Sequence, residues 1–255
     1  MAEEKTWTAA LCVIGDEILS GRTEDKNVVQ LARWLNDQGI ELAEVRVVPD
    51  QEERIVEAVN ALRDRYDYCF TTGGIGPTHD DITVDSIAAA FGVGVVIHPE
   101  ARRMLEDYYR DRADGLKLTE ARLRMARVPD GAELIANPSS GAPGVKIGNV
   151  YILAGVPWIA AAMMHALTGT LEGGVPVTSV TVGARAPESD VADLLRETQD
   201  AHPGVSIGSY PFFKDGRYGS NFVIRSRDAD LAERCGGVLA DGLRKAGFEP
   251  VEGGL

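Results

Sequence analysis

The sequence contains little of what characterises secreted, membrane-spanning or disulfide-rich proteins. Three cysteines, far apart in 255 residues, make no disulfide framework, so buried thiols in a reducing compartment are expected. No apolar run approaches the length of a membrane span, and the first residues, MAEEKTW, lack the basic and apolar regions of a signal peptide. We therefore expect a cytoplasmic protein with no membrane partner.

Positive charge is also scarce in this chain. Lysine and arginine total 26 against 39 aspartates and glutamates, so the formal net charge is −13. The acidic residues are spread along the chain, which disfavours binding to nucleic acid through its phosphate backbone. A small phosphorylated ligand can still bind an acidic protein when a divalent cation such as Mg²⁺ mediates the contact.

Strand-like and helix-like stretches alternate through the first two thirds of the chain. Apolar runs predict strands at 8–14, 43–47, 68–72 and 150–153, and helical periodicity predicts helices at 28–35, 55–62 and 86–91. This order predicts a mostly parallel α/β sheet covered on both faces. A short strand at 95–97 and charged helices at 100–113 and 119–126 are expected to form a peripheral lobe.

A glycine-rich stretch, TGTLEGGVP, interrupts the periodicity at 168–176 and predicts a linker. We place the boundary near residue 172, which gives domains 1–172 and 173–255. The second domain is predicted to contain strands at 178–182, 205–210 and 221–225, helices at 190–201 and 228–245, and a closing strand at Phe248. The order β-α-β-β-α-β predicts a small split α+β domain.

The most informative segment is TTGGIGPTHDDIT, which lies at a predicted strand-to-helix turn. Its glycines carry no side chains, so backbone N–H groups can approach an anion, and Thr83 is predicted to cap the next helix. No Gly-Lys-Ser or Gly-Lys-Thr follows, so the segment is not a P-loop, and steric need alone also explains glycines in such turns. The predicted phosphate-binding residues here are Thr72, Gly73, Gly74, Gly76, Pro77, Thr78 and Thr83.

Carboxylates accompany this turn. Asp80 and Asp81 are adjacent and repel each other unless a cation or a proton lies between them, although both could be solvated acids at a helix start. Asp50 ends the second predicted parallel strand and so reaches the same sheet edge, unless it is a turn residue that caps the next helix. His79 is a candidate acid or base, and the alternative is a surface histidine.

Three further loops are predicted to reach this edge. They are GDEILSG at 15–21, SSGAPG at 139–144 and GVP at 155–157, and ordinary loop, turn or cap roles explain each of them nearly as well. The candidate ligand-binding residues in these loops are Gly15, Asp16, Glu17, Ser139, Ser140, Gly141, Gly144, Gly155 and Pro157.

The motifs GDEILSG, VVPD, TTGGIGPTHDDIT, SSGAPG and GVP, in this order, resemble the MoaB/Mog superfamily, and in particular the amino-terminal region of the competence/damage-inducible protein A (CinA) family. The resemblance covers about residues 8–165. It implies a three-layer α/β fold that binds molybdopterin or its adenylated form at the carboxyl edge of the sheet. SIGSYP, at 206–211, resembles the small domain that follows in CinA.

This resemblance implies metal-dependent cleavage of a nucleotide pyrophosphate such as ADP-ribose by a homodimer. Asp50 and Asp81 would be the functional acids and metal ligands, with Asp80 or His79 as the base that deprotonates water. CinA relatives usually read LPGVP followed by a basic residue, Glu and Met, whereas this chain reads LAGVPWIAAAMM, with isoleucine at 159 in place of the acid. Binding of molybdopterin or a nucleotide without turnover, adenylyl transfer, and a non-catalytic regulatory dimer therefore stay open as alternatives.

Overall fold

The computed structural model describes residues 5–110, 114–214 and 216–255. They form two compact units, with the division between Gly174 and Val175. The boundary predicted from sequence lies two residues before this division. Each unit is described here by itself.

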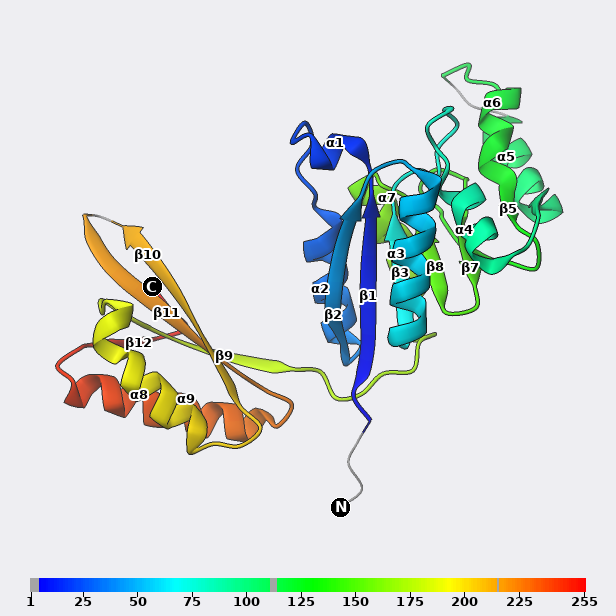
Figure 1. Cartoon of the computed structure of the whole chain (residues 1–255). Helices are drawn as coiled ribbons and strands as arrows, with labels where there is room; N and C mark the ends of the chain where they lie inside the picture. The colour runs from blue at the N-terminus through cyan, green and yellow to red at the C-terminus, as the bar shows by residue number, and fades with distance from the viewer. Residues whose placement is uncertain (1–4, 111–113, 215) are drawn as a thin grey trace. The chain divides into compact units, whose positions relative to one another are not determined.

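The first unit is built on a six-stranded sheet of order β2-β1-β3-β8-β7-β6 (Figure 1). Strands β2, β1, β3 and β8 are parallel, whereas β7 runs antiparallel to both of its neighbours. The predicted mostly parallel α/β fold is therefore confirmed. The strands are β1 (Trp7–Ile14), β2 (Ile40–Val48), β3 (Tyr68–Thr72), β6 (Glu133–Ile135), β7 (Gly144–Ile147) and β8 (Val150–Leu153).

Helices cover both faces of this sheet. On one face, α2 (Asn27–Asp37) and α7 (Pro157–Ala166) pack against alternate residues of β1, whose members are Ala9, Leu11 and Val13. On the other face, α3 (Glu52–Arg65) and α4 (Thr83–Phe91) pack against Ala10, Cys12 and Ile14. Every residue of β3 is buried, as expected for a central parallel strand. The two cores make the predicted three-layer arrangement.

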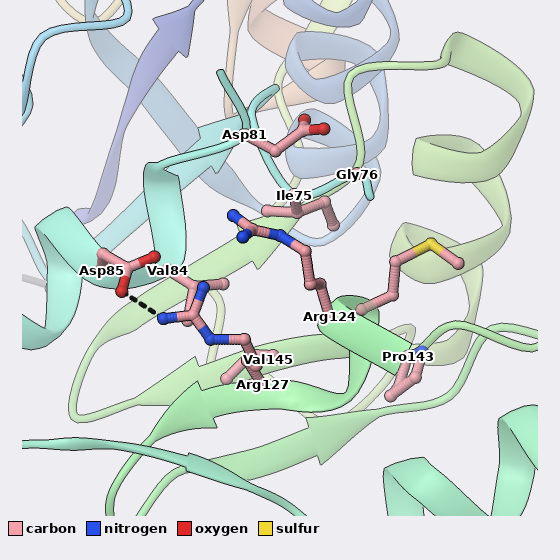
Figure 2. A pocket seen from close by; sticks show the side chains of 10 residues that line it. Ile75, Gly76, Asp81, Val84, Asp85, Arg124, Arg127, Pro143 and Val145 are labelled. Atoms are coloured by element: carbon pink, nitrogen blue, oxygen red, sulfur yellow. Dashed lines mark hydrogen bonds and ion pairs between the residues drawn. The ribbon is translucent and has the colours of Figure 1, made fainter. Parts of the chain in front are cut away.

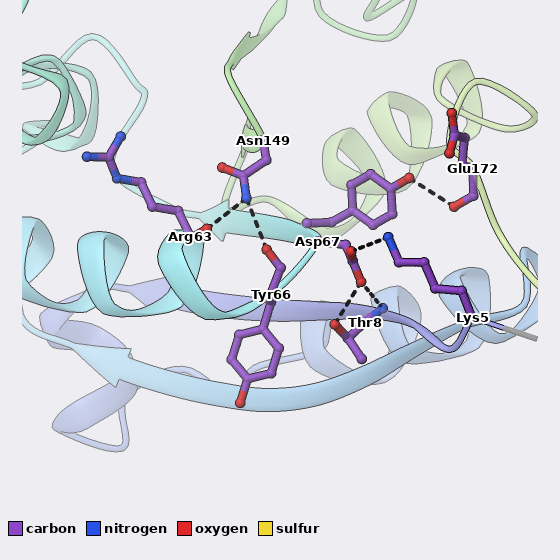
Figure 3. Close-up of polar contacts among 8 residues, drawn as sticks. Lys5, Thr8, Arg63, Tyr66, Asp67, Asn149 and Glu172 are labelled. Atoms are coloured by element: carbon purple, nitrogen blue, oxygen red, sulfur yellow. Dashed lines mark hydrogen bonds and ion pairs between the residues drawn. The ribbon is translucent and has the colours of Figure 1, made fainter. Parts of the chain in front are cut away.

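Side-chain hydrogen bonds fix the amino ends of the strands (Figure 3). Asp67, immediately before β3, accepts from the backbone N–H of Thr8 at 2.9 Å and pairs with Lys5 at 2.7 Å. Asn149, immediately before β8, donates to two carbonyl oxygens at the end of α3, at 2.9 and 3.0 Å. These contacts hold β1, β3 and β8 in register at one edge of the sheet, while the loops with the predicted site residues lie at the other.

A peripheral lobe follows α4. It contains β4 (Val95–Ile97), α5 (Pro99–Arg110), α6 (Glu120–Leu123), the 3-10 turn η1 (Arg124–Ala126) and β5 (Arg127–Pro129), and β4 pairs with β5. The helix predicted at 119–126 is divided between α6 and η1. The predicted end of the preceding helix, at residue 113, lies outside the described residues. Buried Ala101, Leu105 and Ala126 give the lobe its own small core.

The second unit contains β9 (Thr178–Ala184), α8 (Glu188–Asp200), β10 (Ser206–Lys214), β11 (Arg217–Ser226), α9 (Ala229–Lys245) and β12 (Pro250–Glu252). Its antiparallel sheet has the order β10-β11-β9-β12, so the predicted β-α-β-β-α-β order is confirmed. The closing strand is not at Phe248, as predicted, but at 250–252. Phe248 instead closes the end of α9, where its N–H donates to the carbonyl oxygen of Leu243 at 2.9 Å.

The three cysteines are buried and free, as predicted. Burial raises the pKa of the Cys12 and Cys69 thiols to about 12, so both stay protonated and unreactive at neutral pH. In the described ranges, none of the helices combines the length and the apolar character that crossing a bilayer would require.

Phe70, on the central strand β3, is a fully buried aromatic side chain. Its ring stacks on Tyr151 at 5.0 Å and meets the edge of Trp34 at 6.0 Å between centroids. Phe70→Ala should lower the free energy of unfolding by about 3–5 kcal/mol, because it removes buried area and leaves a cavity. Urea unfolding would measure this loss. The control is Val29→Ala, at a side chain that is 52% exposed on α2, and it should change stability by less than about 0.5 kcal/mol. Equal losses of stability in the two variants would contradict the assignment of Phe70 to the core.

Candidate functional site

Three strand ends converge on Gly73 at the carboxyl edge of the sheet. A Cβ atom on Gly73 would lie 2.0 Å from the carbonyl oxygen of Ile14, at the end of β1. A Cβ on Gly155, which follows β8, would lie 3.1 Å from the Cα of Gly73. Gly73 and Gly74 also have positive φ angles of 103° and 63°. No other residue type fits this junction without displacing backbone.

The same turn presents backbone donors to the site. In the described part of the chain, the N–H groups of Gly74, Ile75 and Gly76 donate to no protein acceptor, whereas that of Gly73 donates to Leu153 at 3.4 Å. Consecutive unpaired N–H groups form a concave surface of partial positive charge that suits an anion. The glycines therefore serve the backbone geometry and also leave room for a phosphate.

Thr83 stabilises this turn, although not by capping a helix as predicted. It is the first residue of α4, and the N-cap position belongs to Ile82, which makes no side-chain cap. The Thr83 hydroxyl donates instead to the carbonyl oxygen of Gly73 at 2.8 Å, because that carbonyl lies directly beside it. A Cβ on Gly74 would lie only 2.2 Å from the same hydroxyl oxygen. Thr83 thus fixes the predicted phosphate turn on the side of α4.

Asp81 lies against the outer side of the turn (Figure 2). Its Oδ2 accepts hydrogen bonds from the N–H of Thr78, at 2.7 Å, and from the Thr78 hydroxyl. A Cβ on Gly76 would lie 2.6 Å from the same oxygen. Thr78 therefore orients the carboxylate, and glycine at 76 provides the space that the carboxylate occupies.

Asp50, which follows β2, is affected by the charges of several other acids. Its Oδ2 accepts from the N–H of Asp16, the first residue of α1 (Asp16–Leu19), at 2.9 Å, and it does not cap α3. Burial raises the pKa of Asp50, and the nearby charges of Glu17, Asp16 and Asp80 raise it further against the lowering effect of that hydrogen bond. The charges of carboxylates from three separate loops therefore act on Asp50 together, and a cation bound nearby would offset their repulsion.

His79, predicted as an acid or base, lies fully in solvent. The His79 side chain is 99% exposed, and its Nδ1 lies 3.8 Å from Asp80 Oδ1. Over the residues described, no three side chains of the His, Cys, Asp and Glu types are arranged to hold a metal ion among themselves. A metal at this edge would thus have to complete its coordination with ligand oxygens and water.

A cavity of about 530 Å³ lies between these loops, which is the size of common nucleotide and cofactor pockets. Nine of the predicted site residues line it: Glu17, Gly73, Gly74, Gly76, Pro77, Asp81, Ser140, Gly155 and Pro157. Thr72 lines a smaller neighbouring hollow of about 50 Å³. The remaining predicted residues lie outside the lining of the large cavity: Gly15, Asp16, Asp50, Thr78, His79, Asp80, Thr83, Ser139, Gly141 and Gly144.

The loop from Ser139 to Gly141 is shaped by a buried amide. Asn137 donates from Nδ2 to Ser140 Oγ and to the carbonyl oxygen of Ala142, both at 2.7 Å, and it accepts from the N–H of Ser139 at 3.1 Å. A Cβ on Gly141 would lie 2.5 Å from the ring of Tyr108. This loop therefore approaches α5 closely and presents Ser140 to the cavity.

Two parts of the cavity wall were missed from the sequence. Tyr108, Tyr109 and Met125 come from the peripheral lobe, and the two tyrosine rings meet edge to face at 5.1 Å between centroids. The apolar side chains that line the wall beside α7 are Ala154, Val156, Ile159 and Met163. The adjacent tyrosines in a charged helix were the only local signal of a ring-binding surface. Gly144 was predicted as a loop residue of the site but is the first residue of β7. The sequence of this strand, GVKI, has no continuous apolar run that would have indicated it.

Comparison with known proteins decides the family. Residues 10–173 match the family described as "Probable molybdopterin binding domain". The chain belongs to the MoaB/Mog family, in its CinA-like branch. Residues 176–252 of this CinA-like chain match a second family, described as "FAD synthase, middle domain".

Individual relatives agree with this assignment. A CinA-like protein of Frankia casuarinae is 32% identical over 260 residues, which cover 96% of this chain and 60% of that protein. A protein of Aeropyrum pernix is 39% identical over 207 residues, which cover 78% of this chain and 76% of the relative. The solved structure of CinA from Thermoplasma acidophilum, described as of unknown function, is 32% identical with a TM-score of 0.59, over 65% of this chain and 98% of that one. The chain thus spans only 60% of the Frankia protein.

The cavity departs from the usual CinA pattern at one side chain. The resemblance to CinA implies an acid at the position of Ile159, and here an apolar side chain lines the wall. The acidic side chains on the wall of this CinA-like cavity are Glu17 and Asp81, among the residues described.

The raised pKa of Asp50 gives a prediction about stability and pH. A carboxyl group whose pKa in the folded protein lies above its ordinary value of 3.8 favours the fold fully below pH 3.8, and this contribution is lost as the pH rises through the folded-state pKa. Asp50→Asn keeps an oxygen that can accept from Asp16 but does not titrate. Urea unfolding at a series of pH values should show the stability of the wild type falling relative to that of Asp50→Asn across this window. A relative stability that rises with pH would contradict the burial described for Asp50.

The contact between Gly76 and Asp81 gives a second prediction. Gly76→Ala should push the Asp81 carboxylate away from Thr78, because the new methyl group would overlap it, while stability changes by less than about 1 kcal/mol since only one half-buried side chain moves. Gly94→Ala is a matched control, since a Cβ there meets nothing within 4 Å. Chemical shifts of Thr78 and Asp81 should move in the first variant only. Unchanged shifts in Gly76→Ala would contradict the described geometry.

Proposed function

We propose that this CinA-like domain is a metal-dependent hydrolase of nucleotide pyrophosphates of the ADP-ribose type. The observation that carries the proposal is the position of Asp81, a carboxylate oriented by Thr78 against a turn of unpaired backbone N–H groups. This arrangement pairs an anion-binding surface with an oxygen ligand for a cation. Both are needed where an acidic protein acts on a diphosphate.

The two ends of the cavity suit the two parts of such a substrate. Gly73, Gly74 and Gly76 supply the diphosphate end, and Tyr108 with Met125 supplies an aromatic and apolar end where a base can stack. Ser140 can hydrogen-bond a sugar hydroxyl through its own hydroxyl group. A volume of about 530 Å³ accommodates a nucleotide with part of its second sugar.

The available oxygens fit a magnesium ion that arrives with its substrate. Mg²⁺ is usually bound by one or two carboxylates together with substrate phosphates and water, and it does not need a cage of protein ligands. Asp81 would hold it, with Glu17 as the further acid on the cavity wall, whereas Asp50, the second predicted ligand, lies outside the cavity lining. Bound there, the ion would neutralise phosphate charge and make a coordinated water more acidic.

The reaction is a hydrolysis at phosphorus. A water oxygen forms a bond to the phosphorus of the AMP half, the bond from that phosphorus to the bridging oxygen breaks, and ADP-ribose yields AMP and ribose 5-phosphate. The N–H groups of the turn stabilise charge on the phosphoryl oxygens. Asp80 and His79, the two predicted bases, lie outside the cavity lining, so the water would lose its proton to one of these exposed side chains or to the solvent.

A second candidate function is binding of a nucleotide or a pterin without turnover. The apolar side chain of Ile159 on the cavity wall, where the resemblance to CinA implies an acid, favours it. In that case the same turn and the same tyrosines would bind the ligand, and no bond would break.

Assay of AMP release from ADP-ribose tests the proposal. The wild type should release AMP with Mg²⁺, Mn²⁺ or Co²⁺ and not with EDTA, and Asp81→Asn should lower kcat/KM at least about a hundredfold, since a charged transition-state contact is lost. Asp64→Asn, at an exposed acid on α3, is the control and should keep full activity. A folded wild type that releases no AMP with any of these ions would refute the proposal. Tight binding with the ligand recovered unchanged would establish the second candidate instead.

A further inference from the structure

Cationic side chains are absent from the lining of the large cavity, as far as the chain is described. The phosphate turn, however, also borders a small hollow of about 20 Å³, which shares Ile75, Gly76, Asp81 and Met125 with the cavity. Its far side carries Arg124 and Arg127 (Figure 2). Two cations therefore lie behind the turn in a protein whose net charge is −13.

The two arginines differ in their partners. Arg127 forms an ion pair with Asp85, on α4, so its charge is already balanced. The Arg124 side chain makes no ion pair or hydrogen bond within the described ranges, and its Nε is buried without an acceptor. In Figure 2 its guanidinium extends alongside Ile75, between Asp81 and the Arg127–Asp85 pair. Arg124 is thus a cation with unused hydrogen-bonding capacity beside the turn.

An anion at the turn could accept hydrogen bonds from the Arg124 guanidinium and from the backbone N–H groups of the turn. A buried hydrogen-bond donor without an acceptor lowers stability. The position of Arg124 Nε next to unpaired backbone N–H groups therefore points to a ligand whose oxygens accept from the guanidinium and from the backbone. A guanidinium matches phosphate especially well, because its parallel N–H groups reach two oxygens at once. Arg124 also lies in η1, whose backbone is fixed between α6 and β5, so little ordering is needed when the anion binds.

We propose that Arg124 binds a phosphate of the ligand at the Ile75–Gly76 turn and thereby makes the cavity select phosphorylated ligands over uncharged nucleosides. This inference rests on the proposed function. Arg124 would make binding depend on the negative charge of the substrate. The hollow beside Arg124 holds about one water molecule, so the phosphate would lie in the adjoining cavity at the shared residues Ile75, Gly76 and Asp81, and the Arg124 guanidinium would reach it across the turn. Arg124 is a binding residue in this arrangement, and it transfers no proton.

Binding of three probes tests the role of Arg124. Calorimetric titrations with inorganic pyrophosphate, ADP-ribose and adenosine would be made in EDTA and again with Mg²⁺. Arg124→Gln should weaken pyrophosphate and ADP-ribose binding at least about tenfold and leave adenosine binding unchanged, and Arg124→Lys should lie between it and the wild type. Arg103→Gln, at an exposed arginine of the same lobe, should bind all three probes as the wild type does.

Thermal unfolding separates binding from a structural role. Because Arg124 has no protein partner to lose, Arg124→Gln should have the Tm of the wild type, whereas a structural residue would lower it when replaced. A lowered Tm together with equal loss of adenosine binding would overturn the proposal. Unchanged pyrophosphate affinity in Arg124→Gln, or no pyrophosphate binding to the wild type in either condition, would overturn it too.

The two proposals can fail separately. If the wild type binds pyrophosphate in an Arg124-dependent way and releases no AMP from ADP-ribose, hydrolysis is refuted and the role of Arg124 stands. If AMP is released and Arg124→Gln has the same KM for ADP-ribose as the wild type, hydrolysis stands and the role of Arg124 is refuted.

Discussion

The close contact between Gly73 and the carbonyl oxygen of Ile14 is the constraint on which the carboxyl edge of the sheet depends. It brings the end of β3 against the end of β1 and leaves Gly155, after β8, in contact on the other side. Polar side chains then lock the junction: Asn27 donates to the carbonyl oxygen of Gly155, and Thr83 to that of Gly73, both at 2.8 Å. With these carbonyl groups engaged, the N–H groups that follow in the turn are the ones left for a ligand.

The site joins two structural parts with opposite charge. The parallel sheet supplies the turn and the acids, of which Asp81 and Glu17 line the cavity. The peripheral lobe supplies the tyrosines and the unpaired guanidinium of Arg124. In the proposed complex with a diphosphate, the lobe would supply the Arg124 guanidinium and the acids of the sheet would hold a cation, so both parts would be needed. The short loop around Asn137 packs its Gly141 against Tyr108 and so connects the two parts.

Much of the fold and part of the site followed from the sequence. The central strands have apolar or alternating patterns and the helices beside them are periodic, so the layers and the glycine turn were predicted, and Asp81, one of the predicted acids, lines the cavity. Strands β6 and β7 were not predicted, because their sequences, ELI and GVKI, lack the continuous apolar run that marks β8. Thr83 was misassigned because its hydroxyl bonds to a carbonyl brought near by folding. Tyr108 and Arg124 were missed, since the packing of the lobe that places them depends on contacts between residues distant in sequence.

The gathering of Asp16, Glu17 and Asp80 around Asp50 has a consequence that acts before any contact forms. A cluster of like charges at a cavity mouth produces a negative potential that concentrates divalent cations locally and repels free anions over a Debye length of about 8 Å in physiological salt. A diphosphate that already carries a divalent ion has less charge to repel, so it enters more readily than the bare anion. Under the proposed function, these acids would favour the arrival of the metal-bound form of the ligand over the bare anion.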